Sequence, residues 1–231
     1  MLAVAEPDGY IRRMTILTNT GGVAMTNCFL IADEVARQAV LFDAPNDTTA
    51  MLLDEAKKNG WEIIALCLTH AHFDHMLDHP VVTARFPKAK VLLHRLDEPK
   101  LQHPEIQTRM FMLPFDIPPR SADAYVEDNE IIRVGQCEIQ ALHTPGHAAG
   151  HVCYYCADKE KPFVIGGDLI IQGAVGRTDL PDSDYDTLMA SIRRVMKLPH
   201  GTRLLPGHGE PSTLEEELRT NQYVQEAMKP A

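Results

Sequence analysis

Three histidines and one aspartate fall within six consecutive positions of the sequence, directly after an apolar run. The stretch LTHAHFDHM supplies His70, His72, Asp74 and His75. Neutral imidazoles and carboxylates are ligands for borderline or hard divalent cations such as zinc, iron and manganese. The residue types and their spacing therefore indicate that this cluster binds metal.

Three more polar residues follow the same local pattern, in which a short apolar strand leads to an abrupt turn. His147 ends TPGH after CEIQALH, Asp168 follows FVIGG, and His208 lies in the PGHG that follows TRLL. Glycine or proline beside each residue lets the backbone turn sharply where the side chain must project. Folds built on sheets place their ligands at strand ends. We therefore expect seven candidate metal ligands to converge, namely His70, His72, Asp74, His75, His147, Asp168 and His208.

Seven ligands are too many for one tetrahedral ion, but they suit two ions that share a bridging carboxylate. Two metal ions about 3.5–4 Å apart hold a hydroxide between them and stabilise the developing oxyanion. A metal also lowers the pKa of bound water from about 15.7 to about 7. The set therefore predicts a hydrolase with two divalent cations, zinc being favoured over iron or manganese. Because the set contains no cysteine, it argues against a closed structural zinc site.

The remaining histidines and the cysteines give weaker signals. His79, His94, His103 and His200 stand alone, and we expect ordinary surface or core roles for them. The CYYC stretch has the spacing of a zinc or redox pair, but it lies in a strand-like run. Side chains three apart on a strand point to opposite faces, so core packing is predicted for these two thiols.

The composition of the chain disfavours several kinds of binding partner and location. The formal charge of −10 disfavours binding to nucleic acid or anionic lipid. No apolar run approaches the about 18 residues of a membrane span, and MLAVAEPDGYIRR does not resemble a signal peptide. We therefore expect a cytoplasmic protein with no membrane or nucleic-acid partner. No pattern in the sequence indicates an oligomeric state.

The order of predicted elements favours a layered α/β sandwich over one doubly wound sheet, because strands fall in two batches that each carry helices. One domain over residues 1–231 is the simplest organisation. Apolar runs predict strands at 12–17, 26–32, 38–44, 62–68, 89–94, 130–134, 137–143, 151–157, 162–167 and 202–207. Helical patterns occupy 46–60, 79–87 and 184–199, with a last helix after Thr213. Asn46 or Asp47 would cap the first helix, and Thr213 with Glu216 forms a capping box.

The segment 103–121 is rich in Pro and Met, has no clear period, and is predicted to be a functional loop over a site.

The combined motifs resemble the metallo-β-lactamase superfamily, whose signature HxHxDH matches residues 70–75. TPGHAAGH, GGDLIIQGAVGRTDLP and PGHGEPST are most similar to the small, single-domain glyoxalase II-like hydrolases. The resemblance spans nearly the whole chain. It implies a four-layer αββα sandwich with metal ions at one edge.

The resemblance also implies a role for each candidate ligand. His70, His72 and His147 would bind the first metal, Asp74, His75 and His208 the second, and Asp168 would bridge them. Asp74 would in addition act in catalysis by orienting the nucleophile. His151 would be structural, and Arg177 with Asp179 would form a buried ion pair that fixes a loop near the site.

The implied activity is hydrolysis of a small-molecule, hydroxyacylglutathione-like thioester by a metal-bridging hydroxide. A thiol leaving group with a pKa of about 8.5 needs little protonation. Two departures from the family pattern bear on the substrate. Residues 76–79 read MLDH where relatives carry small residues, and only 23 residues, including an acidic EEE, follow His208. Two-domain glyoxalase II enzymes carry there a helical domain with basic residues that hold glutathione, so glutathione itself is not assured as part of the substrate.

Three alternatives remain. A persulfide dioxygenase would use one iron on the subset His72, His147 and Asp168. Lactonase or phosphodiesterase activity would use the same nucleophile as the thioesterase. A non-catalytic protein on this fold is disfavoured because the ligand set is complete, and nuclease activity is disfavoured by the acidic charge.

Overall fold

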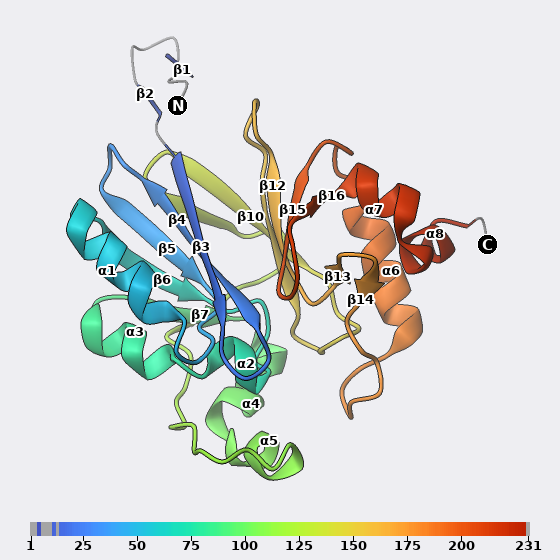
Figure 1. The fold of residues 1–231 in the computed structure, drawn as a ribbon, viewed down its shortest axis with the longest axis horizontal. Helices are drawn as coiled ribbons and strands as arrows, with labels where there is room; N and C mark the ends of the chain where they lie inside the picture. Colours follow the sequence, from blue (N-terminus) through green and yellow to red (C-terminus); the bar gives the residue numbers. More distant parts are fainter. Residues whose placement is uncertain (1–3, 6–10, 13, 230–231) are drawn as a thin grey trace.

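The computed structural model describes residues 4–5, 11–12 and 14–229, and Figure 1 shows two β-sheets packed face to face with helices outside them. The N-terminal segment 1–13, in which no signal peptide was expected, lies outside the described residues except for two short paired strands. These are β1 (Val4–Ala5) and β2 (Ile11–Arg12). Arg13, part of the strand predicted at 12–17, also lies outside them.

The first sheet has six strands in the order of the sequence. They are β3 (Met14–Gly21), β4 (Thr26–Asp33), β5 (Gln38–Phe42), β6 (Glu62–Cys67), β7 (Lys90–Leu93) and β8 (Ala124–Tyr125). β3 to β5 are antiparallel, and β5 to β8 are parallel. β4 is buried on both faces: Cys28 and Leu30 pack under the helices, whereas Phe29 and Ile31 pack against the other sheet. This alternation follows from the two-residue period of a strand.

The second sheet has the strand order β16-β15-β12-β11-β10-β9. Its strands are β9 (Ile131–Val134), β10 (Cys137–His143), β11 (Val152–Cys156), β12 (Phe163–Gly167), β15 (Arg203–Pro206) and β16 (Ser212–Thr213). β12 and β15 are parallel, so the chain leaves both strands at the same edge of the sheet. A separate hairpin follows β12, formed by β13 (Ile170–Ile171) and β14 (Ala174–Val175).

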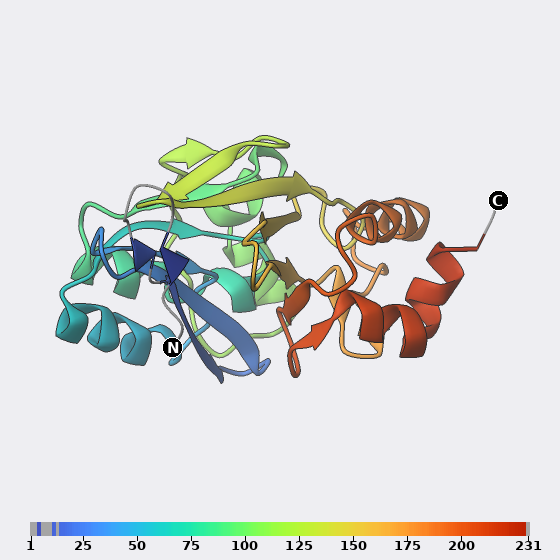
Figure 2. The same cartoon turned by 90° about the horizontal axis from the view of Figure 1, so that it is seen from above.

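Helices form the two outer layers. They are α1 (Thr49–Asn59), α2 (Phe73–Met76), α3 (His79–Arg85), α4 (Glu98–Gln102), α5 (Glu105–Met110), α6 (Tyr185–Val195), α7 (Leu214–Thr220) and α8 (Gln222–Ala227), with a 3-10 turn η1 (Arg95–Asp97). α1 and α3 cover the first sheet, and α6 to α8 cover the second, an order of layers that is also visible from above (Figure 2). None of the described helices is long and apolar enough to cross a membrane.

Three apolar clusters fill the spaces between these layers. The first lies between α1, α3 and the first sheet, the second between the two sheets, and the third between the second sheet and α6 to α8. The predicted four-layer αββα sandwich is therefore confirmed. The two thiols of CYYC belong to different clusters, Cys153 to the third and Cys156 to the second, as a strand requires.

Local sequence signals account for some of the helix ends. Gly60 ends α1 in the left-handed conformation with φ of 69°, and the Thr213 hydroxyl accepts a hydrogen bond from the Glu216 amide (3.1 Å). The predicted cap of α1 is wrong, because Thr48 occupies that position instead of Asn46 or Asp47. Asp47 itself has φ of 58°, so the chain enters the helix after it.

One buried tyrosine connects the two sheets next to the histidine cluster. Tyr154 of β11 is fully buried, and its hydroxyl donates to the carbonyl of Leu68 (2.9 Å), two residues before His70. Its ring also packs on Phe42, with 4.9 Å between centroids. This contact fixes the end of β6 against the second sheet.

Replacing Tyr154 with Phe should lower the free energy of unfolding by about 1–3 kcal/mol, because the buried Leu68 carbonyl loses its donor. Urea denaturation followed by circular dichroism measures this change. Tyr185→Phe is the control: its partly exposed hydroxyl bonds Glu226 (3.0 Å), and its removal should change stability by less than about 0.5 kcal/mol. Equal losses in the two variants would contradict the assigned role of Tyr154.

Candidate metal centre

The loops that follow β6, β10, β12 and β15 meet at one edge of the sandwich, between the two sheets. Each loop carries at least one of the seven candidate ligands, as the sequence pattern predicts. Six are buried, and His208 is partly exposed, with 23% of its side chain accessible. The structure therefore brings together all of His70, His72, Asp74, His75, His147, Asp168 and His208.

The seven side chains form three overlapping groups, one of which, His70 with His75 and Asp168, connects the other two. Ligand atoms of His70, His72 and His147 lie within 4.8 Å of one another, and so do those of Asp74, His75 and His208. Asp168 lies between the groups. Its Oδ2 is 3.5 Å from Nε2 of His147 and 3.3 Å from Nε2 of His208, and its Oδ1 is 3.4 Å from Nε2 of His75. This is the arrangement that a bridging carboxylate between two cations requires.

Several buried polar atoms at the centre have no hydrogen bond within the described part of the chain. They are Nε2 of His70, Nε2 of His75 and Oδ1 of Asp168. Burying an unpaired polar group is costly, so each such atom calls for a partner. Nδ1 of His72 and Nε2 of His147 also face each other at 2.9 Å. Divalent cations fit this donor set, because they would accept lone pairs from all of these atoms at once.

Two of the imidazoles, those of His70 and His72, are held in the neutral form that binds metal. Burial, reinforced by neighbouring imidazoles, lowers the pKa of His70 well below its usual value. Burial and then His147 lower the pKa of His72 to about 4. Both rings are therefore neutral at pH 7, with a lone pair available to a cation.

The two carboxylates at the centre are ionised in spite of burial. Burial raises the pKa of Asp74, but His75 and His208 outweigh it and bring the pKa to about 2. The pKa of Asp168 is likewise held well below its usual range by His75 and His208, against the effect of burial. The same two carboxylates raise the pKa of His75 and bring that of His208 to about 10, against the effect of burial, so these imidazoles balance the carboxylates in the absence of cations.

Asp43 orients the ring of His75 through a contact with its Nδ1. It follows β5, and its Oδ2 lies 2.8 Å from Nδ1 of His75, while its Oδ1 accepts the Thr69 amide (2.7 Å). Fixing Nδ1 in this way directs Nε2 toward Asp168, and such outer partners set ring tautomer and orientation in metal sites. The sequence prediction missed Asp43. Its signal was present, since QAVLFD repeats the pattern of a strand followed by an aspartate.

Backbone and hydroxyl groups hold two other rings. The Nδ1 of His147 lies 2.9 Å from the Arg177 carbonyl, and the Nδ1 of His70 lies 3.1 Å from the Thr69 hydroxyl. Gly176 makes the first contact possible, because a Cβ there would lie 2.7 Å from Nδ1 of His147. His151 lies outside the ligand groups and accepts the Asp168 amide on Nε2 (3.1 Å), in keeping with a structural role.

Asp97, also missed from the sequence, joins two of the ligand loops. It is fully buried, and its Oδ2 accepts the Ala71 amide while its Oδ1 accepts the Gly150 amide, both at 2.7 Å. One carboxylate therefore fixes the backbone inside HAHFDH and the backbone after His147. No local pattern marks it, because its partners lie far away in the sequence.

The C-terminal ligand loop is held by the first sheet. The Asn27 side chain donates to the carbonyls of Pro206 (2.9 Å) and Gly209 (2.8 Å), on either side of His208. Beside it, the Thr26 hydroxyl donates to Oδ2 of Asp74 (2.7 Å). The start of β4 thus positions one candidate ligand from each half of the chain.

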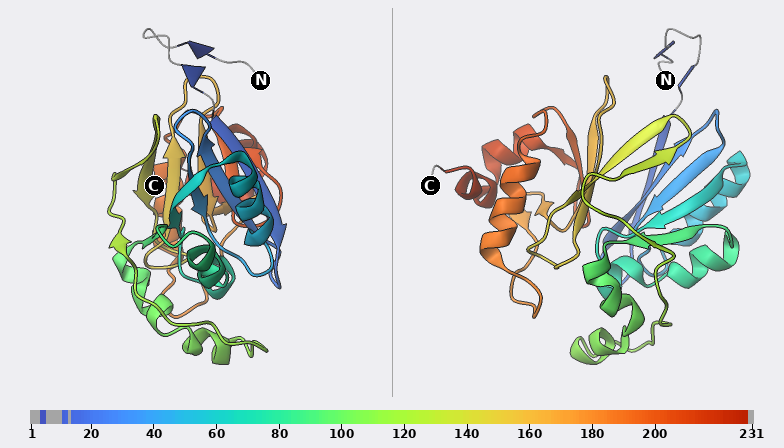
Figure 3. Two further views of the ribbon diagram at one scale, coloured as in Figure 1. Left: turned by 90° about the vertical axis from the view of Figure 1, so that its left-hand side faces the viewer. Right: turned by 180° about the vertical axis from the view of Figure 1, so that it is seen from behind.

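The segment 103–121 covers the centre, as predicted, but it is not structureless. It contains α5, which with α4 lies at the lower end of the molecule in both views of Figure 3. Gln107 of α5 donates to the Ala71 carbonyl and accepts the Phe73 amide, both at 2.9 Å. These two bonds support the backbone of the cluster from outside.

The ion pair predicted between Arg177 and Asp179 forms, with 2.6 Å between Nε and Oδ1. Its predicted burial is wrong, because the two side chains are 55% and 68% exposed.

The isolated histidines stay outside the centre, as expected. His79 and His94 are buried, and His103 and His200 are exposed.

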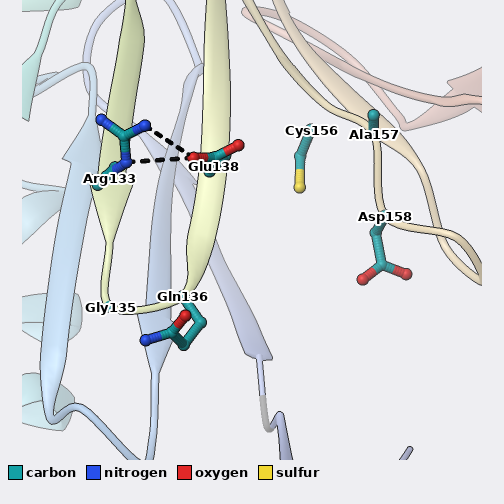
Figure 4. Close-up of a pocket in the computed structure, with 7 residues that line it drawn as sticks. All are labelled: Arg133, Gly135, Gln136, Glu138, Cys156, Ala157 and Asp158. Atoms are coloured by element: carbon teal, nitrogen blue, oxygen red, sulfur yellow. Dashed lines mark hydrogen bonds and ion pairs between the residues drawn. The ribbon is translucent and has the colours of Figure 1, made fainter. Parts of the chain in front are cut away.

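A cavity of about 250 Å³ opens onto the candidate ligands and is also lined by Ala24, Phe111 and Arg177. A separate cavity of about 440 Å³, shown in Figure 4, lies by the β9–β10 turn and the end of β11. Arg133 and Glu138 form an ion pair at its wall (2.9 Å). It lies at the opposite end of β10 and β11 from the candidate ligands, so it is not part of the centre.

The model of the metallo-β-lactamase superfamily matches residues 21–208, and the chain belongs to this superfamily. Membership and the histidine–aspartate cluster together identify a metal-dependent enzyme. The hydroxyacylglutathione hydrolase GloC of Haemophilus influenzae is 30% identical over 213 residues, which cover 86% of this chain and 92% of that protein.

Two solved structures extend the comparison. The B3 metallo-β-lactamase BLEG-1 is 30% identical with a TM-score of 0.82, and the match covers 91% of this chain and 99% of that one. TTHA1623, solved in a di-iron-bound form, is 35% identical with a TM-score of 0.77, over 90% of this chain and 99% of that one. The architecture is therefore shared with a B3 metallo-β-lactamase and with a protein that binds two iron ions.

Replacing Asp43 with Asn should weaken metal binding about 10- to 100-fold, because an amide cannot accept both the Thr69 amide and the His75 ring proton. Competition with a chromophoric chelator measures the affinity. Asp33→Asn is a matched control, since Asp33 is equally buried but accepts the amides of Val35, Ala36 and Gln136 away from the centre. It should lose stability and keep its metal affinity. Equal loss of affinity in both variants would mean that Asp43 acts only through the fold.

Proposed function

We propose that this protein is a dinuclear metal-dependent hydrolase that cleaves a small-molecule thioester of the hydroxyacylglutathione type. The observation that carries the proposal is the position of Asp168 between two complete groups of candidate ligands. In this assignment His70, His72 and His147 hold one cation, and Asp74, His75 and His208 hold the other. Similarity to GloC, named a hydroxyacylglutathione hydrolase, supports the thioester.

Two bound divalent cations, for which zinc is our first choice, would supply Lewis acidity and lower the pKa of water. The protein contributes the rest. Asp74, ionised at pH 7 and anchored by the Thr26 hydroxyl, accepts a hydrogen bond from the attacking water and orients it. The thiol product has a pKa of about 8.5 and leaves as a thiolate, so the reaction does not require a strong general acid.

A second candidate is a persulfide dioxygenase with one iron on His72, His147 and Asp168. Two contacts favour this subset: 2.9 Å between Nδ1 of His72 and Nε2 of His147, and 3.5 Å from His147 to Asp168. The di-iron form of TTHA1623 also shows that a relative takes iron. We rank it second because it leaves His75 and His208 without a function.

The two candidates differ in metal content. The purified protein dialysed against zinc should hold two ions per chain, His208→Ala should hold one, and Asp168→Ala should hold neither tightly. His200→Ala, which removes an exposed histidine eight residues away, should keep two. Mass spectrometry of acid-digested samples counts the ions. A single iron per chain that is unaffected by His208→Ala would favour the dioxygenase instead.

The reaction is tested by release of free thiol from S-lactoylglutathione, detected with a thiol reagent. The zinc-loaded protein should turn over, a chelator should abolish the reaction, and added zinc should restore it. Asp74→Ala should lower kcat by at least about 100-fold, since it removes both a ligand and the group that orients water. If no metal-dependent thiol release occurs, while glutathione persulfide consumes oxygen, the thioesterase proposal fails.

A further inference from the structure

Beside the candidate metal centre lies a second cavity, of about 260 Å³, whose walls are mainly apolar. We call it the side cavity and define it by Leu96, Pro99, Ile106, Met110, Phe111 and Leu180. These residues come from η1, α4, α5 and the loop before α6. The segment that covers the centre therefore also encloses apolar space.

The side cavity adjoins the cavity at the candidate ligands. His72, Phe111 and Leu180 line both. A molecule whose reacting carbonyl lies at the centre can therefore extend a substituent past His72 into the side cavity.

The rim of the side cavity exposes large apolar side chains together. Leu96 is 53% exposed, Ile106 is 57% exposed and Met110 is 49% exposed. Single exposed apolar residues are ordinary, but a group of them around a cavity marks a binding surface. Binding an apolar group here would remove this area from water.

The charges that line the side cavity do not favour a strongly anionic occupant. Lys100 is the one cationic side chain among the described residues that line the side cavity, and it is already paired. Its Nζ lies 2.7 Å from Oδ1 of Asp97 and 2.5 Å from Oδ2 of Asp182. Two carboxylates therefore neutralise the group that would otherwise attract the carboxylates of glutathione.

We propose that the side cavity binds an apolar arm of the substrate, a hydrocarbon group attached on the acyl or the thiol side of the scissile thioester. The inference rests on the proposed thioesterase function and narrows its substrate class. Within the proposed thioester class, substrates that carry an apolar arm are then cleaved faster than S-lactoylglutathione, which has none. Apolar burial against Ile106, Met110 and Leu180 supplies the selectivity.

Two substrate series test the proposal with the zinc-loaded protein. One lengthens the acyl chain from acetyl to decanoyl on N-acetylcysteamine, and the other lengthens an alkyl thiol on a fixed acetyl group. In one series kcat/KM should rise up to about fourfold for each added methylene until the cavity is filled. The series that rises identifies which side of the thioester occupies the cavity. Flat profiles in both series would overturn the proposal.

Two matched variants test whether the dependence of kcat/KM on chain length arises in the side cavity. Met110→Gln makes the wall of the side cavity polar, whereas Met112→Gln alters a methionine two residues away that is 88% exposed and does not line the cavity. Met110→Gln should flatten the dependence of kcat/KM on chain length. Met112→Gln should behave like the unchanged protein. An equal effect of the two variants would overturn the proposal.

A binding measurement separates this proposal from the proposed reaction. Calorimetric titration of the metal-free protein with decan-1-ol and butan-1-ol should show tighter binding of the longer alcohol, weakened by Met110→Gln alone. Such binding without any thioester cleavage would retain the apolar site and reject the thioesterase. Cleavage with neither chain-length dependence nor decanol binding would reject the apolar site and retain the thioesterase.

Discussion

The structure depends on one costly arrangement, an ionised carboxylate buried among imidazoles. Asp168 lies within 3.5 Å of imidazole nitrogens from three other loops, and one of its oxygens has no hydrogen bond among the described residues. Desolvation opposes such an arrangement unless opposite charge compensates for it. Protons on His75 and His208 can supply part of that charge, and divalent cations can supply it more completely. The fold consequently holds the loops after β6, β10, β12 and β15 in place around the Asp168 carboxylate.

The contacts that hold these loops are themselves buried. Asp43 fixes His75, Asp97 joins two ligand loops, and Asn27 holds the loop of His208 against the first sheet. Because each of these side chains accepts or donates at least two hydrogen bonds, each restrains a loop rather than a single ring. The covering segment adds Gln107, so the helix that borders the apolar side cavity also supports the cluster.

The sequence alone was sufficient for the layers, the strand ends and the seven converging side chains, because these follow from local patterns of apolar runs, glycine and proline. It was not sufficient for interactions between distant residues. Asp97 meets Ala71 and Gly150 only after both sheets have packed. The exposure of Arg177 depends on what covers its loop, which no local pattern encodes. The short helix α5 escaped notice because six residues carry too little periodicity.

The bond from Asn27 to the Pro206 carbonyl joins residues 179 positions apart, and it has a kinetic consequence. Contacts of such high sequence separation pay the entropy of closing a long loop and form slowly. We therefore expect the imidazole of His208 to join the other candidate ligands late in folding. A partly folded chain without the Asn27–Pro206 contact would lack the imidazole of His208 as a ligand and would bind cations more weakly. In the proposed centre, two bound cations would therefore indicate that folding is complete.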